Sequence, residues 1–239
     1  TVCSIRRDRL LRRERMFRWV GPVHEYLVVA GRQLRSRAAV THLPVRHHGE
    51  RNLGIYTALM KAGRVFTPHD CFYFANEWYD HGEYEQAIQY YLQFVASLDA
   101  NSTQIEDAIA VCARLADSYA AVGDGERAVT WALKSFAYDT PRAEFCCRLG
   151  YAFLQRQQWR QAAFWYETAT KLEPLESAEL RCGLIDHPCW TWLPHLQLCV
   201  CFDRLGDRQL AWEHNEIARQ YRPSDPAILR NKAYLESPL

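Results

Sequence analysis

The chain contains no long apolar run. None of its hydrophobic stretches approaches the ~20 residues that an α-helix needs to cross a bilayer, and no secretory signal opens it. We therefore expect no membrane span. The 239 residues and their composition fit one or two globular domains.

Net charge is also nearly absent, at +1, but this balance conceals two segments of opposite sign. Residues 1–64 contain 14 Lys and Arg against 4 Asp and Glu, whereas residues 65–239 contain 15 against 24. The chain therefore divides into a basic and an acidic body. The clustered arginines of residues 6–15 are suited to nucleic-acid phosphates. No nucleic-acid fold signature accompanies them, so a solvated or domain-facing charge run is the better interpretation.

Nine cysteines raise the alternatives of disulfides or a zinc site. Cys146/Cys147 and Cys199/Cys201 fall within helical patterns, where neighbours at i+1 and i+2 point in different directions. The cysteines at or near inward-facing positions are Cys71, Cys112, Cys146 and Cys199. We interpret them as buried, reduced thiols that act as small hydrophobes, which favours a cytoplasmic protein.

What the chain does contain is one residue pattern in four copies. Each copy has a small residue about five positions after a turn position, with aromatic residues at fixed offsets on both sides. The small residues are Ala87, Ala128, Ala162 and Ala211. This is the signature of the tetratricopeptide repeat, a 34-residue helix-turn-helix whose apolar face needs a stacked neighbour. We predict a mainly α fold, with a helical solenoid of about four repeats and a capping helix over residues 65–239.

The turn positions indicate where the repeats are interrupted. Three of them hold the residue best suited to left-handed backbone: Gly82, Gly123 and Gly206. Gln157 takes this place in the third copy. Successive turn positions are 41, 34 and 49 residues apart, so we expect one insertion near residues 99–102 and another at about 175–190. Thr103 and Glu106 predict a capping box for the helix after the first insertion.

The basic segment contains a run rich in β-branched and aromatic residues, 17–29, with a Gly-Pro break in its middle. This run predicts two short strands joined at a bend, with a partner strand at residues 39–43. A helix should follow Gly49, with Tyr56 on its apolar face and Gly63 beyond its end. Two or three strands do not make a stable domain.

Several segments together resemble a known family. They are Arg-Trp-Val-Gly-Pro-Val-His-Glu at 18–25, His42, Arg51-Asn52, Phe-Tyr-Phe-Ala-Asn-Glu at 72–77 and Cys-Trp-Thr-Trp-Leu-Pro-His-Leu at 189–196. Over nearly its whole length the chain is similar to bacterial family-2-like glycosyltransferases of the GT-A fold. These enzymes carry C-terminal tetratricopeptide repeats and are related to the sublancin-type peptide S-glycosyltransferases. The pairing of a Val-His-Glu strand with the repeats is more specific than either feature alone.

The resemblance implies a division of labour along the chain. In that family the GT-A domain binds a nucleotide sugar through an Asp-x-Asp motif whose carboxylates hold a divalent cation. Residues 1–64 look like the tail of such a domain, a short α/β remnant, and residues 65–239 like the repeat domain. We expect the Mg or Mn ion only in the full-length enzyme, no tightly bound cofactor in this chain, and no sugar transfer by this chain alone.

The resemblance also implies site residues, because the chemistry needs an imidazole near the diphosphate and a carboxylate near the acceptor. His24 is the expected ligand of the metal or diphosphate, with His42 as the alternative metal ligand. Glu25 is the candidate catalytic or orienting carboxylate, and next to His24 on a strand it should face the other side of the sheet. Arg18 is the candidate contact to the donor diphosphate. The alternative for His24, His42 and Glu25 is that each is a hydrogen-bonded residue of the sheet. The alternative for Arg18 is a solvated side chain at a strand edge.

The repeats imply a protein or peptide partner, since stacked helical pairs present a concave face. By resemblance we also expect a homodimer. Trp190 and Trp192 in the second insertion are candidate partner anchors, with packing against the following helix as the alternative. The leading hypothesis is the C-terminal part of a cytoplasmic glycosyltransferase. A non-enzymatic tetratricopeptide-repeat adaptor is the alternative, and nucleic-acid binding is the weakest hypothesis.

Overall fold

The computed structural model describes residues 11–32, 34, 49–98, 105–173 and 186–237. Its contacts divide the chain into an N-terminal unit within Ser4–Ala100 and a C-terminal unit within Asn101–Leu239. The predicted division at 64/65 separates the basic segment from the repeats and stays a prediction. In the part of the chain that is described, no helix combines the length and the apolar character needed to span a bilayer.

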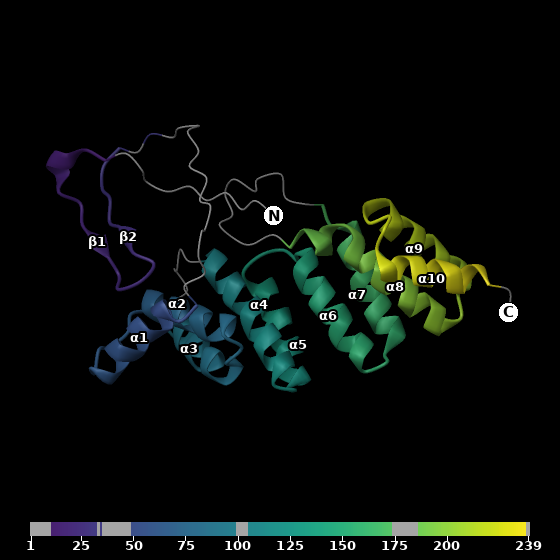
Figure 1. Ribbon diagram of the computed structural model, residues 1–239, viewed down its shortest axis with the longest axis horizontal. Helices are drawn as coiled ribbons and strands as arrows, with labels where there is room; N and C mark the ends of the chain where they lie inside the picture. The colour runs from purple at the N-terminus through teal and green to yellow at the C-terminus, as the bar shows by residue number, and fades with distance from the viewer. Residues whose placement is uncertain (1–10, 33, 35–48, 99–104, 174–185, 238–239) are drawn as a thin grey trace. The chain divides into compact units, whose positions relative to one another are not determined.

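The described part of the N-terminal unit contains a small strand pair, a 3-10 helix and three α-helices (Figure 1). Its elements are the 3-10 helix η1 (Arg13–Arg15), β1 (Trp19–Val20), β2 (Tyr26–Leu27), α1 (Arg51–Lys61), α2 (Pro68–Asp80) and α3 (Tyr84–Ala96). The strands are antiparallel, with Trp19 opposite Leu27 and Val20 opposite Tyr26. The two predicted strands, the helix after Gly49 and the first helical pair are therefore confirmed. The predicted partner strand at 39–43, with His42, lies outside the described residues.

The predicted position of His24 on a strand is wrong. Residues 21–24 form the turn between the strands, and β2 begins only at Tyr26. Gly21 and His24 have positive φ angles of 108° and 53°, which reverse the chain over a few residues. Glu25 follows this turn, so the alternation of a strand does not set the relative directions of His24 and Glu25.

The hairpin is attached to the helices by its turn. Val23 is 7 % exposed and packs with the fully buried Tyr56 of α1 and Phe74 of α2. The strand residues are much more open, since Trp19 is 66 % and Tyr26 43 % exposed. In Figure 1 the turn of the hairpin lies next to α2, and the open ends of the strands lie away from the helices.

Helix α2 has a fixed first turn. Thr67 Oγ1 accepts a hydrogen bond from the backbone N–H of Asp70 at 3.1 Å, and Asp70 Oδ2 accepts one from the backbone N–H of Thr67 at 3.1 Å. Pro68 at the first helical position completes this capping box. The helix that carries Tyr73 and Glu77 therefore begins at a defined residue.

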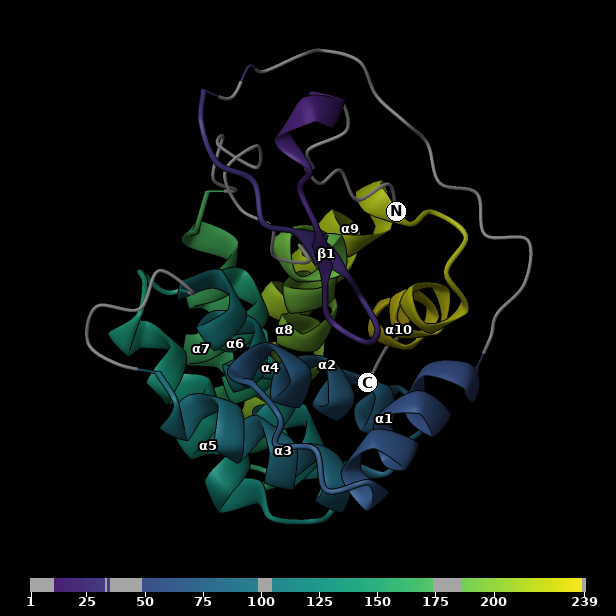
Figure 2. The same ribbon diagram turned by 90° about the vertical axis from the view of Figure 1, so that its left-hand side faces the viewer.

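The C-terminal unit is built of helical pairs (Figures 1 and 2). Its elements are α4 (Ile105–Ala121), α5 (Gly125–Lys134), η2 (Ser135–Ala137), α6 (Ala143–Gln155), α7 (Trp159–Lys171), η3 (His187–Trp190), α8 (Trp192–Leu205), α9 (Arg208–Tyr221) and α10 (Pro226–Glu236). Helices α4 and α5, α6 and α7, and α8 and α9 pack as the predicted pairs, and α10 packs on α9 as the predicted cap. Thr103 of the predicted capping box and residues 175–185 of the second insertion lie outside the described residues.

The small residues of the pattern lie where the paired helices meet. Ala87, Ala162 and Ala211 are fully buried, and Ala128 is 7 % exposed. Closer contact still occurs at Gly150 of α6, because a Cβ atom there would lie 2.8 Å from ring carbons of Tyr166 on α7. The small residues of the repeat pattern therefore lie where the two helices of a pair approach each other closely.

All four turns use the same backbone geometry. In each, the turn residue donates its N–H to a carbonyl three residues back, and the next residue donates to a carbonyl five residues back, as in a Schellman motif. The turn residues have positive φ angles: Gly82 78°, Gly123 84°, Gln157 57° and Gly206 85°. The repeat register predicted through Gln157 is confirmed. The backbone of this residue adopts the left-handed conformation that normally favours glycine.

The predicted burial of cysteines in the helical pairs is confirmed. The described cysteines are buried free thiols: Cys71, Cys112, Cys146, Cys147, Cys189, Cys199 and Cys201. Burial raises the pKa of the Cys112 thiol to about 12, so this side chain stays protonated and packs as a small apolar group.

Candidate functional site

The turn of the hairpin carries a polar cluster on its exposed side. His24 Nε2 lies 3.1 Å from Glu77 Oε1 of α2, and Asn52 Nδ2 of α1 donates to the same oxygen at 3.0 Å. These residues come from three of the segments on which the family resemblance rests. Segments that are far apart in the sequence thus meet at one carboxylate.

The backbone at His24 is held in a sparsely populated conformation. Its φ angle of 53° lies in the left-handed region, which is uncommon for a residue other than glycine. Burial of the preceding Val23 fixes the turn from one side. On the other side, the imidazole stacks on Tyr73 with ring centroids 4.3 Å apart and planes at 17°. The His24 ring is therefore oriented by packing as well as by Glu77.

This arrangement selects one tautomer of His24. A carboxylate only accepts hydrogen bonds, so Nε2 carries the proton that faces Glu77. In the neutral ring Nδ1 then keeps its lone pair. Glu77 is 13 % exposed and His24 is 38 % exposed, so the carboxylate lies below the surface and the imidazole at it. Carboxylates orient catalytic and metal-bound histidines in the same way.

Further rings continue from this cluster along the hairpin. His69 of α2 lies between Tyr73 and Tyr26, with centroid distances of 4.6 Å and 4.8 Å. Burial lowers the pKa of His69, although the neighbouring Asp70 carboxylate acts in the opposite direction. His69 is therefore a neutral ring that helps to hold β2 on α2.

The other predicted site residues do not join His24. Arg18 and Glu25 are exposed, and within the described residues neither has a hydrogen bond or ion pair to His24. Arg18 lines an open hollow with Leu11, Arg12, Met16 and Phe17. Sequence reasoning missed Glu77, Asn52 and Tyr73 as the partners of His24. The signal was present, since Asn52 and residues 72–77 carry part of the resemblance, but nothing in their spacing indicates which side chains meet.

The described residues do not build a metal centre by themselves. Among the described residues, no group of three or more His, Cys, Asp or Glu side chains could hold a metal ion. At the hairpin turn the Nε2 side of His24 is already occupied by Glu77, which leaves a single imidazole nitrogen. One nitrogen is fewer than the ligands that a bound Mg or Mn ion requires.

The C-terminal end of the second insertion is hydrogen-bonded to α6. Trp190 Nε1 donates to Glu144 Oε1 at 2.6 Å, and the backbone N–H of Asp186 donates to the same oxygen at 3.1 Å. Cys189 between them is 3 % exposed and packs in the core cluster of α6, α7 and α8. Trp192 is half-buried, with the Arg222 guanidinium 4.5 Å from its ring centroid. Both tryptophans have packing roles within the C-terminal unit.

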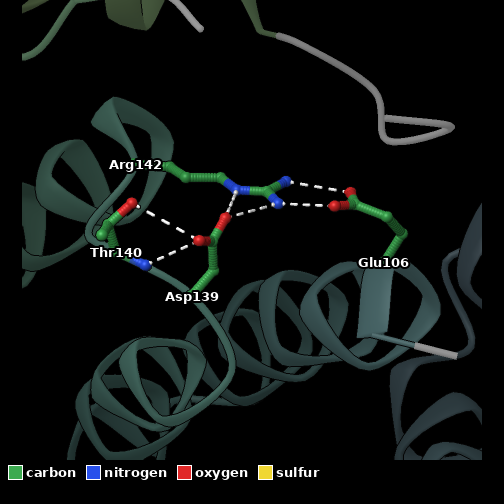
Figure 3. Close-up of polar contacts among 4 residues, drawn as sticks. All are labelled: Glu106, Asp139, Thr140 and Arg142. Carbon is green, nitrogen blue, oxygen red and sulfur yellow. Dashed lines mark hydrogen bonds and ion pairs between the residues drawn. The ribbon is translucent and has the colours of Figure 1, made fainter. Parts of the chain in front are cut away.

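Ion pairs join the first helices of adjacent repeats in this unit. Arg142, at the start of α6, donates to both carboxylate oxygens of Glu106 on α4, at 3.1 Å and 2.8 Å. It also contacts Asp139, as Figure 3 shows. Arg148 makes a second two-pronged contact with Asp117 of α4, at 2.7 Å to each oxygen. These pairs fix the spacing of α4 and α6.

Comparison with known proteins identifies the fold. No protein-family model and no curated protein sequence matches the chain. Among solved structures, MamA AMB-1 is similar with a TM-score of 0.52 and 20 % identity, over 70 % of this chain and 80 % of that chain. The C-terminal part of a TPR repeat-containing protein from Cytophaga hutchinsonii has a TM-score of 0.59 and 13 % identity, over 79 % of this chain and 65 % of that chain. The predicted tetratricopeptide-repeat fold is confirmed.

Proposed function

We propose that this chain is the C-terminal portion of a glycosyltransferase that transfers a sugar from a nucleotide-sugar donor. In this proposal the hairpin turn contributes a group to the catalytic site, and the repeats bind a protein or peptide or join two copies. The chain alone does not transfer sugar. The divalent cation belongs to the full-length enzyme and takes its ligands outside the described residues.

One observation carries the proposal, namely the convergence of His24, Asn52 and Glu77. Hairpin turns that serve only as connections do not require a left-handed histidine, a carboxylate below it and an amide beside that carboxylate. Glu77 selects the tautomer of His24 in which Nε2 carries the proton and Nδ1 carries the lone pair. This lone pair can take the proton of the nucleophile on the sugar-accepting substrate. It can also accept a hydrogen bond from an N–H or O–H group of a substrate.

The proposed roles follow from this geometry. His24 is the group that faces substrate, and Glu77 is a positioning residue that acts through His24. Asn52 donates to the carboxylate and so fixes Glu77. The roles assigned by resemblance to Glu25, Arg18 and His42, as catalytic carboxylate, diphosphate contact and alternative metal ligand, stay part of the proposal.

The test uses the complete natural polypeptide that contains this sequence, with Mg or Mn ions and a panel of nucleotide sugars. Transfer and donor hydrolysis are both measured. His24→Ala should lower turnover by at least about 100-fold. Glu77→Gln should lower kcat by at least about tenfold with little change in KM, because an amide N–H favours the other tautomer of His24.

Glu83→Gln is the matched control. Glu83 lies exposed at the start of α3, six positions after Glu77, so its replacement should leave kcat and KM unchanged. Unchanged turnover in His24→Ala would refute the role of the hairpin turn. Absence of transfer and donor hydrolysis with every nucleotide sugar would refute the glycosyltransferase proposal itself.

The second candidate is a repeat adaptor that binds protein and performs no chemistry. The observation that favours it is the set of confirmed helical pairs, because such stacks bind peptides or subunits in many proteins. Sedimentation over a wide concentration range tests self-association. A mass equal to one chain at all concentrations would exclude dimers formed by the repeats.

A further inference from the structure

Two histidines meet between the last pair of repeat helices. Nδ1 of His195 on α8 lies 2.9 Å from Nδ1 of His214 on α9. The ring centroids are 5.2 Å apart and the planes make an angle of 29°. The centroid distance is close to the N···N distance plus two ring radii, so the nitrogens point at each other nearly head-on. One Nδ1 therefore donates a proton to the lone pair of the other.

The same geometry excludes a metal ion between the two nitrogens. A bound zinc ion lies ~2.0–2.1 Å from each imidazole nitrogen. Two nitrogens that face each other directly would then have to be about 4 Å apart, and these are 2.9 Å apart. A proton fits this gap and a metal does not.

The surroundings of the pair favour neutral imidazoles. Both rings are half-buried, and Phe202 of α8 stacks on His214 with centroids 5.4 Å apart and planes at 5°. Burial and the neighbouring His214 lower the pKa of His195 to about 4. Burial also lowers the pKa of His214, against the opposing influence of nearby carboxylates.

Two carboxylates near the pair oppose the effect of burial. Glu167 on α7 and Glu213 on α9 act on His214 and favour its charged form. The other described charged side chains of α8 and α10 do not act comparably on either ring: Asp203, Arg204, Arg230, Lys232 and Glu236. Burial outweighs the two carboxylates, so the pair is neutral at pH 7.

We propose that the His195–His214 contact is an acid-sensitive lock on the last helical pair, α8 and α9. In the neutral state the single proton between the two Nδ1 atoms joins the helices. When both rings are protonated, two N–H groups face each other, the hydrogen bond is lost and two positive charges repel. Acid thus weakens the pair of helices that precedes the capping helix α10.

The direction of the effect follows from proton linkage. An unfolded histidine takes up its proton near pH 6.5, whereas the folded pair does so at lower pH. The stabilisation is therefore complete above about pH 6.5 and is lost as the pH falls through that value toward about 4. This loss should be greater in α8 and α9 than in α4 and α5.

Nitrogen NMR of the histidine rings tests the shared proton directly. At pH 7 we expect one of the two rings to carry its proton on Nδ1 and the other on Nε2. If both rings are protonated on Nε2 alone, no proton lies between the Nδ1 atoms and the proposal is overturned.

Hydrogen exchange tests the consequence. The protection factor, which is the ratio of intrinsic to observed exchange rate, should fall on the order of tenfold more for α8 and α9 amides than for α4 and α5 amides between pH 7 and about pH 4.5. His195→Asn retains an N–H near the position of Nδ1 but does not titrate, so this extra loss should shrink. His187→Asn, at an exposed position of η3, is the control and should retain it. Equal losses in wild type for both helical pairs would also overturn the proposal.

Discussion

The indole Nε1 of Trp190 donates a hydrogen bond of 2.6 Å to Oε1 of Glu144, a carboxylate that is 8 % exposed. This contact joins the end of the second insertion to the first turn of α6. It accounts for the packing of Trp190 without any partner protein. The role of Trp190 as a partner anchor stays a prediction. The alternative is that Trp190 only stabilises the C-terminal unit, and a mutation can distinguish the two roles.

Trp190→Phe should destabilise the C-terminal unit by about 1–3 kcal/mol. The phenyl ring keeps much of the apolar contact, but the buried Glu144 oxygen loses a strong donor. Urea unfolding measures the change. Trp192→Phe is the comparison, because no hydrogen bond from its indole is found among the described residues. If Trp190→Phe leaves stability intact but abolishes binding to a partner, the anchor interpretation is correct.

Gly150→Ala should destabilise by about 1–3 kcal/mol. The added Cβ would lie 2.8 Å from the Tyr166 ring, which is 2 % exposed and has little room to move. This clash outweighs the higher helix propensity of alanine. Gly54→Ala in α1 is the matched control, because nothing lies within 4 Å of a Cβ at that site. It should stabilise by about 0.5–1 kcal/mol, and equal effects from both substitutions would contradict the close approach of α6 and α7.

Gln157→Gly should stabilise the protein by about 0.5–1 kcal/mol. Gln157 holds a left-handed φ of 57°, which costs energy for any residue with a Cβ. Its neighbour Gln158 has an ordinary φ of −88°, so Gln158→Gly should destabilise through added backbone freedom in the unfolded state. Thermal unfolding of the two variants provides the comparison, and a loss of stability in Gln157→Gly would show that its side chain is needed.

Arg142→Lys should destabilise by about 1–3 kcal/mol although it keeps the positive charge. The guanidinium is 12 % exposed and contacts Glu106 and Asp139 together (Figure 3). An ammonium cannot reproduce that planar fork. Arg127→Lys is the control, since Arg127 is 66 % exposed in its pair with Asp124 and such pairs contribute little. Equal stability of the two variants in chemical denaturation would contradict the role of Arg142.

The fold was predictable at positions where the local structure restricts the type of residue. Ala162 and Gly206 mark close helix approach and left-handed backbone, so the repeats follow from spacing alone. The hairpin was less predictable, because Gly21 and Pro22 indicate a bend but not that it extends to His24. The partner of His24 could not be predicted, since Glu77 is 53 residues away and only the packing of α2 on the hairpin turn brings them together.

The attachment of the hairpin by its turn has a mechanical consequence. Val23 at the turn is buried, whereas the strands are largely open. A displacement of the strand pair is therefore transmitted to the helices mainly through the turn, where His24 contacts Glu77.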